Sequence, residues 1–205
     1  MNIEWIIIWL VFWGAVMGGS NFLFKKYKIT YYQYPWQHTL FFLFAIGALC
    51  LVYKEYFINY FKDIPLYFIP AMFLLFISWI AIPRFYKNDY FIKTERTNYQ
   101  IVKFFEILFQ QLAFLGGLLT FGVAPFVFGL VFFLIHFPAA FFIPKGVAMV
   151  FTSGSLIGGL IFSYLQSQGL WGFVLSLSVH LTFYLVFFYK YNILKPILGG
   201  TPHKR

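Results

Sequence analysis

The chain has 205 residues, of which 61% are hydrophobic, 25% aromatic and only 10% charged, with a mean hydropathy of +0.79. A soluble domain of this length needs more polar surface than this composition supplies. The formal net charge of +9 would suggest nucleic acid in a soluble protein, but the basic residues here lie between apolar runs. That placement favours anionic lipid headgroups as their partners, and we expect no nucleic-acid partner.

The composition predicts an all-α integral membrane protein that forms a single domain over residues 1–205. A bilayer crossing needs about 20 apolar residues. Seven runs come close to that length, namely 5–24, 36–53, 64–82, 101–121, 123–143, 146–165 and 170–189. Gly and Pro in "FGVAP", "IPKG" and "QSQG" predict helix ends between the later runs. Cys50 lies within the second run, and we expect it to be a small packing residue.

The distribution of basic residues predicts the orientation of the chain. The first run has no basic residue before it and "KKYK" follows it, which indicates a retained helix rather than a cleaved signal peptide. With seven spans and the amino terminus outside, thirteen Lys and Arg residues fall on inner segments, including Lys103, and only Lys54 and Lys62 on outer ones. This asymmetry predicts a carboxyl terminus in the cytoplasm. The polar segment 84–100 is expected to lie along the inner membrane surface.

Few hydrophilic side chains occur inside the predicted spans. They are Glu106, Gln110 and Gln111 in the fourth run, His136 in the fifth, and His180 and Thr182 in the seventh. Gln110, His136 and His180 lie seven, nine and ten residues from the basic residues Lys103, Lys145 and Lys190. At about 1.5 Å per residue, all three lie roughly 10–15 Å from those anchors. Three helices are thus predicted to share a polar pocket open to the cytoplasmic side, the alternative being separate cross-links between helices.

The same residues carry a resemblance to a known family. "QQLAFLGGLL" resembles the first motif of the CPBP intramembrane proteases (the CAAX-processing and bacteriocin-processing family), which reads Glu-Glu-x-x-x-Arg followed by Gly. "VFFLIHF" is similar to the second motif, Phe-x-x-x-His, through Phe132 and His136. "SLIGGLIFSYLQSQGLWGFVLSLSVH" is similar to the segment that ends in the histidine of the third motif, here His180. The resemblance covers residues 106–188, and it implies a CPBP-like core over about 101–189.

The resemblance also implies roles for particular residues. In the family the first-motif glutamate activates water, and the histidines, with an asparagine four residues after the last one, assist or stabilise the oxyanion. By position these groups fall on Gln110 and Gln111, on His136 and His180, and on Tyr184; Leu115 replaces the arginine. A neutral amide cannot accept a proton from water near neutral pH. The amides also disfavour a divalent metal, and no cofactor is certain.

Glu106 offers one way to restore a base. It lies one helical turn before Gln110, so both side chains share a helix face. If its surroundings are apolar, its pKa would rise toward the range of a useful base. The alternative is a short-range ion pair with Lys103, three residues earlier, and we favour this pairing.

Three functional hypotheses follow from these residues. The first is a CPBP-type protein that binds membrane-associated or lipidated peptides, with catalysis weak or absent. The second is an active intramembrane protease that uses Glu106 as its base. The third is a non-enzymatic membrane scaffold or immunity subunit that binds a partner protein, in which polar side chains only join the helices.

Overall fold

The computed structural model of the chain describes residues 3–19, 22, 26–27, 31, 33–82, 93–137, 141 and 145–186, without the side chains of 93–96 and 145–147. Regular structure in these ranges is entirely helical, and no strand occurs within them. The all-α prediction is therefore confirmed for the described part of the chain.

The amino-terminal half contains helices at all three predicted runs. Helix α1 (Ile3–Trp13) continues directly into the π-helical turn η1 (Gly14–Gly18), and α3 (Pro35–Val52) and α5 (Phe68–Ala81) follow. Proline at the first position of α3 suits a helix start, where its missing N–H has no helical partner. A short helix that the sequence did not predict, α4 (Lys54–Phe61), connects α3 to α5.

The carboxyl-terminal half contains α6 (Lys93–Thr120), α7 (Pro125–His136), α8 (Lys145–Ser167) and α9 (Leu170–Tyr184). Two tight turns separate these helices at glycines in the left-handed region, Gly122 with φ 63° and Gly169 with φ 89°. Only glycine adopts such angles without strain, which explains the predicted breaks at "FGVAP" and "QSQG". The "IPKG" break includes residues outside the described ranges.

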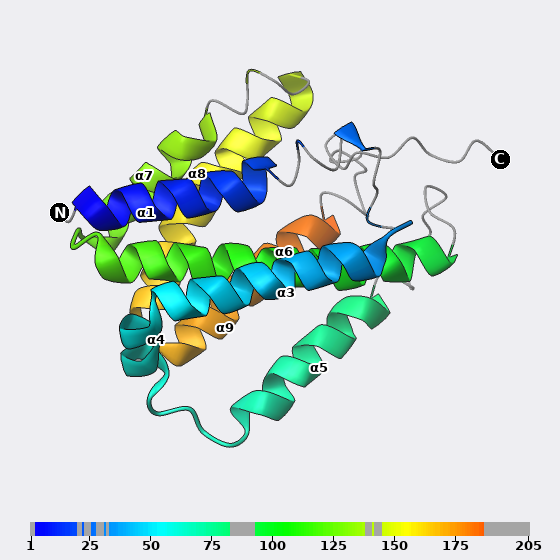
Figure 1. The fold of residues 1–205 in the computed structure, drawn as a ribbon, viewed down its shortest axis with the longest axis horizontal. Helices are drawn as coiled ribbons and strands as arrows, with labels where there is room; N and C mark the ends of the chain where they lie inside the picture. The colour runs from blue at the N-terminus through cyan, green and yellow to red at the C-terminus, as the bar shows by residue number, and fades with distance from the viewer. Residues whose placement is uncertain are drawn as a thin grey trace.

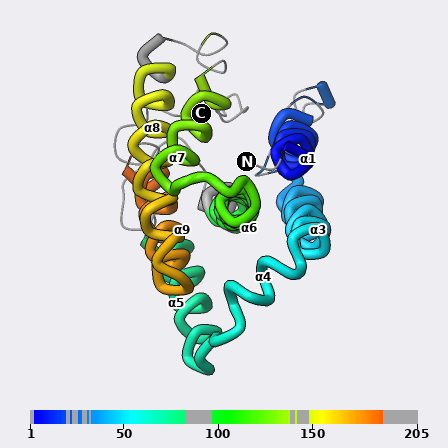
Figure 2. The backbone as a smooth tube through the Cα atoms, turned by 90° about the vertical axis from the view of Figure 1, so that its left-hand side faces the viewer, coloured from blue at the N-terminus to red at the C-terminus, as the bar shows by residue number. Residues whose placement is uncertain are grey.

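Helix α6 is the centre of the bundle. In Figure 2 it is seen end-on, with α7, α8 and α9 on one side and α1 and α3 on the other. Figure 1 shows α1 and α3 running alongside α6, and α5 leaning away from it at one end. In the apolar segment of α6, 83% is buried inside the protein, against 28% in that of α3 and 22% in that of α8. The helix that carries the two glutamines is therefore enclosed by protein rather than by lipid.

Two structural details correct the predicted start of α6. The helix begins at Lys93, eight residues before the expected 101, and its residues Tyr99 and Gln100 are buried. Trp79 of α5 donates its indole N–H to the main-chain oxygen of Gln100 at 2.7 Å. The described part of the 84–100 segment is thus the first part of a buried helix and no surface strip.

Glycines allow the closest helix contacts. A Cβ at Gly129 of α7 would lie 2.8 Å from the main-chain oxygen of Gly159, and a Cβ at Gly159 would lie 2.7 Å from that of Gly129. A Cβ at Gly117 of α6 would meet Trp9 Nε1 at 2.8 Å. The indole N–H of Trp9 also donates to the main-chain oxygen of Ala113 at 2.6 Å, which joins α1 to α6. Side chains at these positions would separate the helices.

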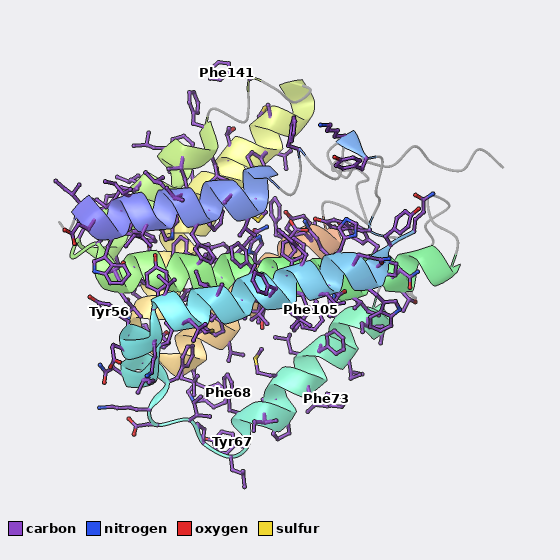
Figure 3. The ribbon with its side chains drawn as sticks, viewed as in Figure 1. Tyr56, Tyr67, Phe68, Phe73, Phe105 and Phe141 are labelled. Atoms are coloured by element: carbon purple, nitrogen blue, oxygen red, sulfur yellow. The ribbon has the colours of Figure 1, made fainter. Side chains whose placement is uncertain are left out.

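The outer surface of the bundle is largely apolar. Leu66 is 88% exposed and Phe44 is 78% exposed, and Figure 3 shows Phe73 and Phe141 on the outside of the bundle. Cys50 is also exposed, contrary to its expected role as a small packing residue. Such a surface is typical of a protein surrounded by lipid.

Three helices are long and apolar enough to cross a bilayer, namely Pro35–Val52, Thr97–Thr120 and Ala148–Ser167. The other four predicted runs coincide with shorter apolar helices. The structure therefore supports a membrane protein with at least these three candidate spans in the described ranges.

Candidate functional site

A cavity of about 820 Å³ lies among η1, α6, α7, α8 and α9. It is close to the carboxyl ends of η1, α7 and α9 and to the middle of α6 and α8. Its wall includes five of the six site residues named from the sequence, which are Glu106, Gln110, His136, His180 and Tyr184. The predicted gathering of three helices around one hollow is present, while the catalytic roles of these residues stay predictions.

Glu106 is held by two neighbours on its own helix. Its Oε1 accepts a hydrogen bond from Lys103 Nζ at 2.7 Å and another from Gln110 Nε2 at 3.0 Å. Both bonds are made to the same carboxylate oxygen. The pairing that we favoured for Glu106 is therefore present.

Lys103 is the unexpected member of this group. It is 2% exposed and lines the cavity, so the prediction that it anchors the inner membrane surface is wrong. Its Nζ lies 4.1 Å from the centroid of the Tyr184 ring, a cation–π contact. Glu106 and the Tyr184 ring together explain how a charged lysine is accommodated inside the bundle.

Tyr31, from the segment before α3, borders the same carboxylate. Burial, reinforced by the negative charge of Glu106, raises the pKa of the Tyr31 phenol well above its ordinary value. The phenol is therefore a neutral hydroxyl that can act as a hydrogen-bond donor at the cavity wall.

Gln111 faces away from Gln110 and belongs to a separate polar network. Its Oε1 accepts from Gln166 Nε2 at 2.7 Å and from Ser176 Oγ at 2.8 Å. Its Nε2 lies 2.8 Å from Nδ1 of His180. Gln111, Gln166 and Ser176 are all at most 1% exposed, so this network joins the interiors of α6, α8 and α9. The side chains of the two adjacent glutamines therefore lie in different places, Gln110 in the cavity wall and Gln111 in the network between the helices.

Aromatic rings position both histidines. His136 lies 4.2 Å from Phe132 and 5.5 Å from Trp13 between ring centroids, and its Nδ1 is 2.8 Å from the main-chain oxygen of Phe132. His180 stacks between Phe162 at 5.2 Å and Tyr184 at 5.5 Å. Because rings and hydrogen bonds both restrain these imidazoles, their remaining nitrogens have a defined direction.

Apart from these groups and the hydroxyls of Ser153 and Ser155, the cavity is apolar, and it reaches the surface of the bundle. Met149 and Ile157 of α8 and Val179 of α9 line it, although they are 74%, 57% and 40% exposed. A space bounded by side chains of both the interior and the outer surface opens at the apolar outside of the bundle. Thr182, by contrast, is exposed and donates to the main-chain oxygen of Ser178, so it does not belong to the predicted pocket.

Tyr31, Gln166 and Ser176 were not singled out from the sequence. Gln166 lies in "QSQG", which has the composition of a surface turn, yet Gln166 is buried and Gln168 is exposed. Ser176 is one hydroxyl in an apolar helix, and a single hydroxyl gives no periodic signal. The sequence places Gln166 four residues before Leu170, where α9 starts. That position does not show whether its side chain points into the bundle or outward.

No family model, curated protein or solved structure matches the chain. In the described ranges no group of three or more His, Cys, Asp or Glu side chains is placed to hold a metal ion. The carboxylate that could ligate one, Glu106, already pairs with Lys103.

Proposed function

We propose that this protein is a CPBP-type membrane protein that binds a membrane-associated or lipidated peptide in the cavity and cleaves it weakly or not at all. One observation carries the proposal. The side chains at the motif positions 110, 136, 180 and 184 line one hollow, while Glu106, the carboxylate on its described wall, is engaged by Lys103 and Gln110. The site therefore keeps hydrogen-bonding groups for a ligand, and its carboxylate is already paired with a lysine.

Seven crossings, with these elements as the first, fourth, fifth, sixth and seventh spans, would place the cavity at the carboxyl ends of η1, α7 and α9 and beside the middle of α6 and α8, whose lining residues fall within 103–110 and 149–162. With the amino terminus outside, the cavity lies in the cytoplasmic half of the membrane, where anionic headgroups interact with the inner Lys and Arg residues.

The size of the cavity suits such a ligand. Pockets of about 300–1,000 Å³ accommodate small organic ligands or short peptide segments. Apolar walls and the access beside α8 and α9 fit a chain that enters from the bilayer, while the polar groups lie deeper. A scaffold protein has no need for a hollow of this volume, so we rank the scaffold hypothesis below the peptide-binding proposal.

Blocking the cavity tests the proposal. Gly158 lines the cavity, and a Cβ there would meet only Phe162 of its own helix at 3.4 Å. Gly158→Leu in nanodiscs should therefore weaken photo-crosslinking of an acylated peptide probe at least about tenfold, since the leucine occupies ligand volume. Gly47→Leu is the matched control, because a Cβ at Gly47 has nothing within 4 Å. Equal crosslinking in both variants would contradict the proposal.

Cleavage is measured in the same system. We expect no cleavage by the wild type and a gain of cleavage in Gln110→Glu/Gln111→Glu. If the wild type cleaves and Glu106→Gln abolishes cleavage while the variant stays folded, Glu106 is the base and the protein is an active protease. If His136→Ala and His180→Ala leave probe binding unchanged, the scaffold hypothesis replaces the proposal.

A further inference from the structure

The two histidines of the cavity each use Nδ1 inside the protein and leave Nε2 for a ligand. For His136 the partner of Nδ1 is the main-chain oxygen of Phe132, 2.8 Å away. A carbonyl oxygen only accepts, so Nδ1 of His136 carries the proton. In the neutral ring Nε2 is then bare and acts as a hydrogen-bond acceptor.

The partner of Nδ1 in His180 imposes the opposite arrangement. Gln166 Nε2 lies 3.3 Å from the main-chain oxygen of Gln111 and 2.7 Å from its Oε1. Because the main-chain oxygen only accepts, the nitrogen of Gln166 must point toward Gln111, and it donates to Oε1 as well. The other end of the Gln111 amide is therefore its nitrogen, which donates to Nδ1 of His180 at 2.8 Å. Nδ1 of His180 is bare, and its Nε2 carries the proton.

We propose that the cavity holds His136 and His180 in opposite tautomers, so that His136 Nε2 accepts and His180 Nε2–H donates, and that this pair recognises the main chain of a peptide. Both side chains line the same cavity, and among the described residues neither Nε2 has a hydrogen-bond partner. The choice of a peptide as ligand rests on the proposed function. The assignment of the tautomers does not.

The chemistry of the pair favours amides. A secondary amide offers an N–H and a C=O, and an extended peptide repeats both at regular intervals along its main chain. An ester or a carboxylate offers acceptors alone, which suits His180 and leaves the bare nitrogen of His136 without a donor. The lysine and carboxylate of the Lys103–Glu106 pair offset each other, so the wall near them gives no preference for an anionic ligand.

Gln111 has a specific task in this arrangement. A glutamate at 111 would accept from Gln166 and Ser176 as the glutamine does, but it has no N–H for His180. A neutral His180 would then have to donate from Nδ1, and its Nε2 would become an acceptor. Gln111 therefore acts as a positioning residue that makes His180 a donor toward the cavity.

Nitrogen NMR of the whole chain, labelled with [15N]histidine in nanodiscs at pH 8, tests the tautomers without any ligand. A bare ring nitrogen and a protonated one resonate far apart. We expect Nδ1 protonated in His136 and Nε2 protonated in His180, with signals assigned by replacing each histidine in turn. His38, whose Nδ1 lies 2.8 Å from the main-chain oxygen of Tyr34, is an internal reference for the His136 pattern. One shared tautomer for His136 and His180 would overturn the proposal.

Two variants separate the task of Gln111 from general disturbance of the network. Gln111→Glu should exchange the protonated and bare nitrogens of His180 and leave His136 unchanged. Ser176→Ala removes one donor to Gln111 but keeps Gln166, so both patterns should persist. An unchanged His180 in Gln111→Glu would show that the glutamine does not set the tautomer. If that variant fails to fold, the wild-type spectrum still decides between one tautomer and two.

A pair of probes tests the ligand class. Dodecanoyl-Ala-Ala methylamide should bind about fivefold to tenfold more tightly than the analogue in which an ester replaces the amide facing His136, since one hydrogen bond is lost. In His136→Phe the two probes should bind alike. If the amide probe and each analogue with one amide replaced by an ester bind equally well to the wild type, recognition of the main chain is refuted. If neither probe binds, the proposed function and the ligand class fail together, and the tautomers are judged by the spectra alone.

Discussion

Glu106 shows how one neighbouring residue decides what a side chain can do. An isolated carboxylate at this depth would be a candidate base. Lys103 Nζ at 2.7 Å and Gln110 Nε2 at 3.0 Å instead both donate to its Oε1. The residue that marks the site in the sequence therefore has a structural task, in which it neutralises a lysine that is 2% exposed.

This ion pair leads to a prediction for stability. Glu106→Gln should lower the free energy of unfolding by about 3–5 kcal/mol, because it leaves the ammonium of Lys103 buried without a carboxylate. The double variant Lys103→Met/Glu106→Gln removes both charges and should return to within about 1 kcal/mol of the wild type. Unfolding in mixed micelles, followed by tryptophan fluorescence, measures both values. A loss below about 1 kcal/mol in Glu106→Gln would mean that the pair is solvated.

The sequence predicted where the site lies better than it predicted which hydrogen bonds the side chains form. The depth estimate from Lys103 brought Gln110 level with His136 and His180, although Lys103 is no surface anchor. The three side chains do line one cavity, but an offset from a basic residue gives depth only if that residue lies at the membrane surface, so the agreement for Gln110 does not follow from the estimate. The directions of Gln110 and Gln111 depend on contacts with α8 and α9, which local sequence does not encode. Gln166 and Ser176 were missed for that reason.

At the scale of the helices, the prediction of apolar runs was accurate in position and less so in extent. The runs were visible because charged residues and turn-forming glycines flank them. Helix α6 extends further toward its amino terminus than its apolar run, since Tyr99 and Gln100 are buried and Gln100 accepts a hydrogen bond from Trp79 of α5. Gly154 and Gly158 have the four-residue spacing typical of close helix contacts, but a Cβ at Gly154 would meet the ring of Phe183, and the main-chain contact between α7 and α8 is formed by Gly129 and Gly159. Spacing alone does not identify the face of a helix that meets its neighbour.

The contact between α7 and α8 gives a prediction at this scale. Gly129→Ala should destabilise the bundle by about 1–3 kcal/mol, because its Cβ would lie 2.8 Å from the main-chain oxygen of Gly159 and neither backbone can yield easily. Gly47→Ala in α3 is the matched control, and it should be neutral or stabilising by up to about 1 kcal/mol, since only the helix propensity changes. Unfolding in mixed micelles compares the two. Similar stability of both variants would mean that α7 and α8 are not in close contact.

At the scale of the whole molecule, the orientation decides which compartment the cavity serves. The cavity lies at the ends of η1, α7 and α9, so it is on the cytoplasmic side only if the amino terminus is outside. In a Cys50→Ser background, Asn2→Cys and Lys62→Cys should react in intact cells with a maleimide that does not cross membranes. His203→Cys should react only after permeabilisation. The physical reason is the excess of Lys and Arg on the segments predicted to be inside. Labelling of positions 2 and 203 from the same side would exclude any odd number of crossings, and labelling of position 203 alone in intact cells would place the cavity in the outer half of the membrane.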